Sequence, residues 1–158
     1  MKDKIIALIP ARSGSQRLKN KNILKIENKH LIGYSIESAI NSKIFDYIFV
    51  STDSKKYANI AKKYGANVPF LRPKKISKST SPDYEWVNFS LKKLEKKKLF
   101  FKYFFILRPT NPFRTAKTIK RAWKLFKKHN SADSLRAVEK SKQHPEKMWK
   151  LRNKFIFP

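Results

Sequence analysis

The chain has 158 residues, no cysteine, and 38 lysines and arginines against 11 acidic residues, which gives a formal net charge of +27. This length suggests one domain with a sizeable core, and the lack of cysteine excludes disulfides and thiolate chemistry. No apolar run approaches the ~20 residues of a membrane span, and the first run is too short for a signal peptide, so we predict a cytoplasmic protein.

The positive charge has two interpretations. One is a basic module that binds nucleic acid through its phosphates. The other is a solvated, lysine-rich surface, which we favour because 30 of the 38 cations are lysines and they are spread over nearly every segment. Arginine, with its planar fork, is better shaped than lysine for phosphate recognition. Nucleic-acid binding is therefore kept only as the alternative function.

Strands and helices are expected to alternate along the chain. In order, the patterns predict a buried strand at 4–10, a helix at 31–42, a strand at 46–51, a helix at 54–64, a short strand at 68–71, a helix that begins at 81–83, a strand at 103–107, a helix at 115–129 and a strand at 134–138. This alternation is typical of an α/β protein with a doubly wound, mostly parallel sheet and helices on both faces. Residues 148–158 resemble the start of a hairpin.

The expected core comes from apolar residues at helical spacing and from one aromatic strand. The strand at 103–107 is continuously apolar, which suits burial on both faces. The inward-facing helical residues are predicted to be Ile32, Ile36, Ala39 and Ile40, then Tyr84, Val87, Leu91 and Leu94, and finally Ile119, Ala122, Trp123 and Phe126.

The loop after the first strand carries the strongest functional signal. In residues 11–22, Gly14 would let the backbone approach a ligand, Ser13 and Ser15 would add hydroxyl donors, and positive charge comes from Arg12, Arg17, Lys19 and Lys21. A buried strand that ends in a cationic loop is a device for holding a polyphosphate. The spacing matches neither a Walker loop nor a dinucleotide-binding fingerprint.

Ligands of doubly wound sheets bind at the carboxyl ends of the strands, so the loops after residues 10, 51, 71 and 107 should gather at one edge. The run 51–54 has two readings that we weigh equally, a helix cap or a ligand contact. The three histidines share no spacing typical of a metal site, and none is assigned to catalysis.

Three segments resemble one family, the CMP-acylneuraminate (sialic acid) synthetases among the sugar-activating cytidylyltransferases. Ala11, Arg12, Ser15, Leu18, Lys21 and Asn22 match that family's first signature in order and spacing. The run 71–73 resembles an Arg-Pro after the family's third strand, and 107–114 resembles its Leu-Gln-Pro-Thr-Ser-Pro-Leu-Arg segment, with Arg108 in place of Gln.

The resemblance implies a fold like that of nucleotide-diphospho-sugar transferases and the transfer of CMP from CTP to a nonulosonic acid, with release of pyrophosphate. It implies catalytic roles for Arg12 and Lys21, and sugar binding by Arg108, Thr110 and Arg114. The residues implied in nucleotide binding are Ala11, Arg12, Ser13, Gly14, Ser15, Lys21, Asn22, Arg72, Ser79 and Ser81. A KDO-type cytidylyltransferase is the second alternative.

Two elements of the family are expected to be missing from residues 1–158. Relatives take their main Mg²⁺ ligands from a segment nearer the C-terminus, and most of their dimerisation element also lies beyond this point. The chain is therefore expected to be a truncated nucleotidyltransferase domain with weak or no synthetase activity alone, and the family's dimer is not expected for it. Mg²⁺ is the expected cofactor, no metal ligand is secure, and Lys78 stands where relatives carry an acid.

Overall fold

The computed structural model describes residues 3–129, 131–138, 150–152 and 155–157. Contacts divide the chain into two units, residues 1–125 and 126–158, and each is described by itself. Among the described residues, no helix is long and apolar enough to cross a membrane. The expectation that residues 1–158 form one domain stays a prediction.

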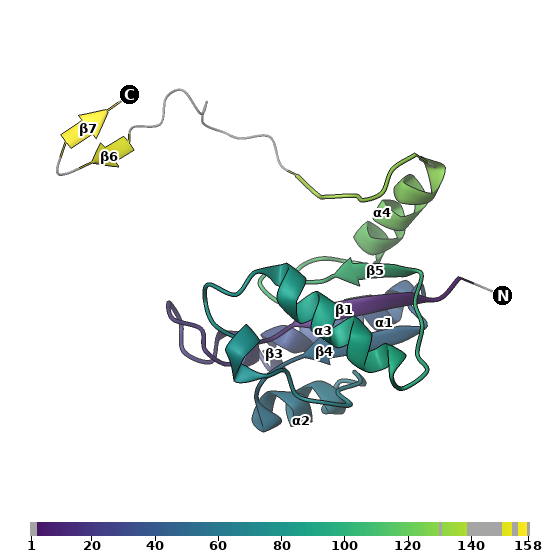
Figure 1. Ribbon diagram of the computed structural model, residues 1–158, viewed down its shortest axis with the longest axis horizontal. Helices are drawn as coiled ribbons and strands as arrows, with labels where there is room; N and C mark the ends of the chain where they lie inside the picture. The colour runs from purple at the N-terminus through teal and green to yellow at the C-terminus, as the bar shows by residue number, and fades with distance from the viewer. Residues whose placement is uncertain (1–2, 130, 139–149, 153–154, 158) are drawn as a thin grey trace. The chain divides into compact units, whose positions relative to one another are not determined.

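The centre of the first unit is a three-stranded parallel sheet in which β1 lies between β4 and β5 (Figure 1). The strands are β1 (Ile5–Pro10), β4 (Tyr47–Ser51) and β5 (Tyr103–Ile106). Ile6 pairs with Tyr47 and also with Phe104, so both neighbours hold the first strand in register. The predicted parallel sheet is confirmed.

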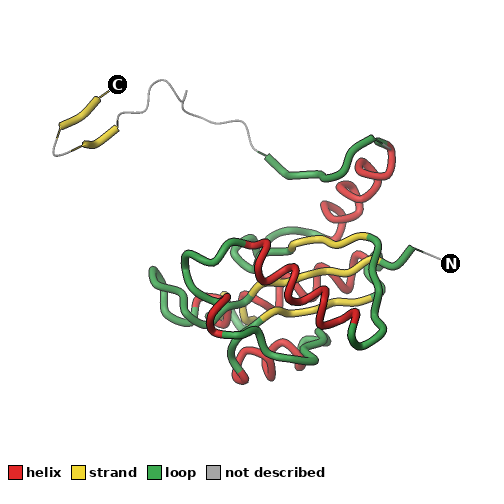
Figure 2. Tube along the Cα trace, viewed as in Figure 1, coloured by secondary structure: helices red, strands yellow, loops and turns green. Residues whose placement is uncertain are grey.

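Helices cover both faces of this sheet (Figure 2). They are α1 (Leu31–Ser42), α2 (Lys55–Lys63), α3 (Asp83–Glu95) and α4 (Ala116–Lys128). Short elements precede two of the helices. The 3₁₀ turn η1 (Lys21–Ile23) and the antiparallel pair β2 (Lys25–Ile26) and β3 (Lys29–His30) lie before α1, and the 3₁₀ turn η2 (Lys74–Ile76) lies before α3.

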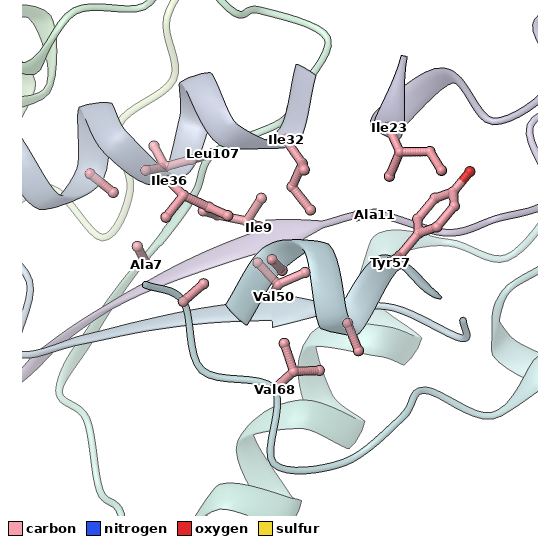
Figure 3. Packing of buried hydrophobic residues seen from close by; sticks show 14 of the residues in the cluster. Ala7, Ile9, Ala11, Ile23, Ile32, Ile36, Val50, Tyr57, Val68 and Leu107 are labelled. Carbon is pink, nitrogen blue, oxygen red and sulfur yellow. The ribbon is translucent and has the colours of Figure 1, made fainter. Parts of the chain in front are cut away.

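The alternation of side chains along β1 explains the two layers, because successive residues of a strand point to opposite faces. Ile6 and Leu8 pack with α3 in one hydrophobic cluster. Ala7 and Ile9 pack with residues of α1, α2 and α4 in the other. Figure 3 shows this second cluster, with Ile32 and Ile36 of α1 and Tyr57 of α2 labelled. Every side chain of β1 from Ile5 to Ile9 is buried, so the doubly wound arrangement predicted from the sequence is confirmed.

Two predicted strands do not form. Residues 68–71 make no ladder, because the only bridge in that region joins Phe49 to Asn67, one residue earlier. Backbone bonds between Asn67 and Ile48 (2.8 Å) and between Val50 and Asn67 (3.0 Å) hold this short extended segment beside β4. Residues 134–138 adopt no regular structure either.

The predicted helix faces are right in part. Ile32, Ile36 and Ala39 are buried, but Ile40 is 42% exposed. On α3 the inward aromatic residue is Trp86 rather than Tyr84, which is 74% exposed, because α3 begins at Asp83 and its buried face follows Trp86, Ser90 and Leu94. On α4 only Ile119 is buried, and Trp123 packs edge-on against Tyr103.

The strand predicted at 103–107 was expected to be buried on both faces. This expectation is wrong, because Phe104 in β5 is 49% exposed. In the second unit, the expected hairpin is present: β6 (Lys150–Arg152) pairs antiparallel with β7 (Phe155–Phe157).

Gly33 of α1 packs so closely against Tyr64 that a larger residue does not fit. A Cβ at position 33 would lie 2.6 Å from the ring of Tyr64, whose hydroxyl accepts a bond from the His30 backbone N–H at 3.1 Å. Overpacking costs ~1–3 kcal/mol, whereas alanine favours a helix by ~1 kcal/mol over glycine. We therefore expect Gly33→Ala to lower the free energy of unfolding, measured in urea, by about 1 kcal/mol. Gly14→Ala is the matched control, because a Cβ there meets nothing within 4 Å; an equal loss in both variants would refute the packing argument.

Candidate functional site

A cavity of about 350 Å³ opens at the carboxyl ends of β1 and β5. Three separate segments of the chain line it, residues 10–22, 72–86 and 108–110, at the sheet edge expected for a doubly wound fold. The lining residues are Pro10, Arg12, Ser15, Lys21, Asn22, Arg72, Ile76, Lys78, Ser79, Ser81, Asp83, Trp86, Arg108, Pro109 and Thr110. Five of them carry positive charge and one carries negative charge, so the cavity is suited to a polyanion.

The loop after β1 brings Arg12 and Lys21 to the same cavity. Asn22, only 6% exposed, joins the two ends of the loop because its side-chain amide donates to the Arg12 carbonyl at 3.0 Å. The Arg12 guanidinium donates to the carbonyl of Gly14 at 2.8 Å, which curls the loop on itself. Both cations therefore line the same cavity, and their roles in catalysis stay a prediction.

Asp53, just after β4, ties this loop to the sheet. Its two carboxylate oxygens accept from the Ser13 backbone N–H and from the Ser13 hydroxyl, both at 2.8 Å. Ser54 is the N-cap of α2, and its hydroxyl accepts from the backbone N–H of Tyr57. The run 51–54 thus contributes a helix cap at Ser54 and a clamp on the cationic loop at Asp53.

Arg72 is the most unusual side chain of the cavity. It is only 5% exposed, and its Nε and Nη2 atoms have no hydrogen-bond partner among the residues that the structure describes. Burial lowers the pKa of its guanidinium from the usual value, and nearby Asp53 opposes that change. The guanidinium lies 5.8 Å from the centre of the Trp86 ring, a cation–π distance. A buried cation with two unused donors is arranged for a ligand.

The loop after β5 forms the opposite wall. The Arg108 guanidinium forms an ion pair with Asp83, the first residue of α3. Asp83 also accepts a bond from Trp86 Nε1 at 2.9 Å, one helical turn further along. The Arg108 carbonyl accepts from the Ser35 hydroxyl at 3.4 Å and from Arg114 Nη2 at 3.2 Å, so the backbone of this loop is fixed from two sides.

The structure gathers nine of the predicted site residues around the cavity: Arg12, Ser15, Lys21, Asn22, Arg72, Ser79, Ser81, Arg108 and Thr110. Four others do not line it. Ala11 is fully buried, Ser13 is bonded to Asp53, Gly14 has open space around it, and Arg114 bonds to its own loop. The close approach of the Gly14 backbone to a ligand stays a prediction.

Among the lining residues that the sequence did not assign to the site, three carry a charge or an aromatic ring: Lys78, Trp86, and Asp83 as the partner of Arg108. When the apolar face of this helix is counted from Tyr84, Trp86 falls outside that face. The spacing of three between Asp83 and Trp86 is the signal that places both on one side of the helix.

The described residues do not form a Mg²⁺ cage. Within the described ranges, no group of three or more His, Asp or Glu side chains lies close enough to hold a metal ion. The two acids near the cavity are already engaged, Asp83 by Arg108 and Trp86, and Asp53 by Ser13. No step of the mechanism is therefore assigned to a metal.

Residues 6–152 match the model of a family described as cytidylyltransferase. This chain belongs to the cytidylyltransferase family. Its relatives include the N-acylneuraminate cytidylyltransferase of Escherichia coli O18:K1:H7, which is 40% identical over 126 residues, covering 80% of this chain and 29% of the relative. The CMP-N,N'-diacetyllegionaminic acid synthase of Legionella pneumophila is 41% identical over 124 residues, covering 78% of this chain and 53% of the relative. A pseudaminic acid cytidylyltransferase of Campylobacter jejuni is 35% identical over 136 residues (86% and 59%).

The chain spans between 29% and 59% of the length of these cytidylyltransferases. Among solved structures, CMP:2-keto-3-deoxy-manno-octonic acid synthetase complexed with CTP has a TM-score of 0.67 at 18% identity, covering 82% of this chain and 49% of that one. A 4-diphosphocytidyl-2C-methyl-D-erythritol synthase has a TM-score of 0.61 at 16% identity (88% and 65%). These likenesses establish the nucleotidyltransferase fold, and the comparisons give no support to the nucleic-acid-binding alternative.

Proposed function

We propose that this chain forms the CTP-binding part of an enzyme that transfers CMP to a nonulosonic acid and releases pyrophosphate. The observation that carries the proposal is the cavity itself, where Arg12, Lys21 and Arg72 converge at the carboxyl edge of the sheet. An excess of positive charge enclosed by protein stabilises a triphosphate more than the same charge does in water.

In this reaction an acceptor hydroxyl attacks the α-phosphorus of CTP. The new P–O bond forms as the bond to the bridging oxygen breaks, the electron pair leaves with pyrophosphate, and the proton of the acceptor hydroxyl passes to solvent water. Arg12 and Lys21 would neutralise the triphosphate and the charge that develops on the leaving group. Arg72, supported by the Trp86 ring, would donate its free N–H groups to the base or phosphates, and Ser79 and Ser81 would donate to the ribose.

The acceptor would lie between this nucleotide and the loop after β5, where Arg108 and Thr110 line the cavity. The names of the relatives suggest sialic, legionaminic or pseudaminic acid as the acceptor, with a KDO-type acid as the alternative. Mg²⁺ would arrive on the nucleotide phosphates, since the described residues of the cavity offer no acidic cage. We assign the reaction to the cytoplasm.

The test is a calorimetric titration of the protein with CTP, UTP and ATP in the presence of Mg²⁺. We expect saturable binding of CTP, with the affinity for UTP at least tenfold weaker, as one unpaired polar group in a site costs ~1–3 kcal/mol. Titration with a DNA duplex at several salt concentrations serves as the control for the net charge, since nonspecific binding falls steeply with salt. Equal affinity for all three nucleotides would refute the proposal.

A further inference from the structure

The ion pair between Asp83 and Arg108 closes one side of the cavity. It joins the first residue of α3 to the loop after β5, and both residues line the cavity. The Arg108 and Asp83 side chains are 53% and 43% exposed. Ion pairs this open to water are weakly held, so a stronger anion can take the place of the carboxylate.

The contacts around the pair allow the Arg108 side chain to leave without disturbing its surroundings. Asp83 keeps a second bond, accepted from Trp86 Nε1 at 2.9 Å. The Arg108 backbone is held separately, through its carbonyl, by Ser35 and Arg114. Exchange of the partner therefore requires only rotation of the Arg108 side chain.

Asp83 is also the only acid among the described residues that line the cavity. An anionic ligand bound next to Arg108 has to compete with Asp83 for the guanidinium and is repelled by the same carboxylate. A guanidinium binds a carboxylate through two parallel N–H···O bonds, so a second carboxylate is a suitable replacement.

We propose that Asp83 is the resident counter-ion of Arg108 and that the carboxylate of the nonulosonic acid displaces it. The inference rests on the proposed function and adds a residue that sets the affinity for the acceptor. Arg108 contacts the acceptor, and Asp83 acts through Arg108 as a positioning residue. Before the acceptor binds, Asp83 also keeps the guanidinium beside the cavity.

The test compares Asp83→Asn, Arg108→Gln and the double variant. The asparagine of the first variant keeps a side-chain oxygen for Trp86 Nε1 but removes the competing charge. Acceptor affinity is measured by calorimetry with a nonhydrolysable CTP analogue and Mg²⁺ present, using sialic, legionaminic and pseudaminic acids in turn, and then the methyl ester of the acid that binds best. The affinity for the CTP analogue is measured separately in each variant.

We expect Asp83→Asn to tighten acceptor binding about threefold to fivefold, in line with the small strength of an exposed pair. Arg108→Gln should weaken it about tenfold or more, as loss of a charged hydrogen bond does. The double variant should match Arg108→Gln, because without the guanidinium there is no competition. The methyl ester should bind weakly and respond little to either change, and the affinity for the CTP analogue should change less in each variant than the affinity for the acid does.

Asp3→Asn is the matched control, since Asp3 forms a similarly exposed pair with Lys102 elsewhere on the molecule. Weaker acceptor binding by Asp83→Asn would overturn the proposal, and so would equal effects of this variant on the acid and on its methyl ester. A higher affinity for the CTP analogue without a higher affinity for the acid would also overturn it, as would failure of the protein to bind any of the three acids. Failure of the parent protein to bind CTP would refute the proposed function separately, because that affinity is determined without an acceptor.

Discussion

Replacing Arg72 with methionine is expected to weaken CTP binding at least tenfold and yet leave the protein as stable as before or more stable. Arg72 is 5% exposed, and two of its nitrogens lack a hydrogen-bond partner within the described part of the chain. Hydrogen bonds from a charged group to a ligand contribute ~1.5–3 kcal/mol each, and the variant loses them. A buried unpaired cation destabilises the folded state, and a nonpolar residue of similar length removes that cost.

The expected effects of Arg72→Met on CTP affinity and on stability differ in sign, and each is measured separately. Calorimetry gives the affinity for CTP, and thermal unfolding without ligand gives the stability. Arg114→Met is the matched control, because Arg114 also has a buried nitrogen without a partner but does not line the cavity. It should leave CTP affinity unchanged. Unaltered CTP binding in Arg72→Met, or a marked loss of its stability, would show that Arg72 serves packing rather than the nucleotide.

Asp53→Ala is expected to weaken CTP binding about tenfold by releasing the loop of residues 11–22. Asp53 holds Ser13 to the sheet through two bonds of 2.8 Å. Loss of two charge-assisted bonds costs ~2–4 kcal/mol in a partly buried position. The same change should lower the free energy of unfolding by a similar amount, and a freed loop costs more entropy to order around a triphosphate.

Asp53→Asn separates the clamp from the charge. An asparagine can accept from the Ser13 N–H and donate to its hydroxyl, so the clamp is retained while a negative charge near the phosphates is removed. We expect it to bind CTP at least as well as the parent protein, with Ser13→Ala intermediate between it and Asp53→Ala. If the asparagine and alanine variants lose affinity equally, the carboxylate charge matters and the clamp does not.

The sequence was sufficient to predict the parallel sheet and the edge at which its loops gather. The signal was strong because β1 is buried on both faces and its apolar run ends sharply at Pro10. Residues 68–71 carry a similar pattern at weaker strength, yet they lie beside β4 with one bridge at Asn67. Four apolar residues cannot distinguish a ladder from extended chain, because the partner strand decides.

Within the site, the charged residues were predictable and their partners were not. Arg12, Lys21, Arg72 and Arg108 follow strand ends, where topology alone places them together. The pairing of Asp83 with Arg108 depends on where α3 begins, and helix starts are uncertain by one or two residues from sequence. Trp86 was missed for a different reason, because the apolar face was aligned on Tyr84, whereas the buried face follows Trp86, Ser90 and Leu94.

The central place of β1 has a consequence for how the protein is made. The strand leaves the ribosome before both of its partners, which follow roughly 40 and roughly 100 residues later, at synthesis rates of ~5–20 residues per second. The nascent chain therefore carries an unpaired apolar edge for several seconds before β5 arrives. Any pause in translation before residue 106 lengthens this exposure. The need for chaperones should therefore depend on the time that passes between the synthesis of β4 and the synthesis of β5.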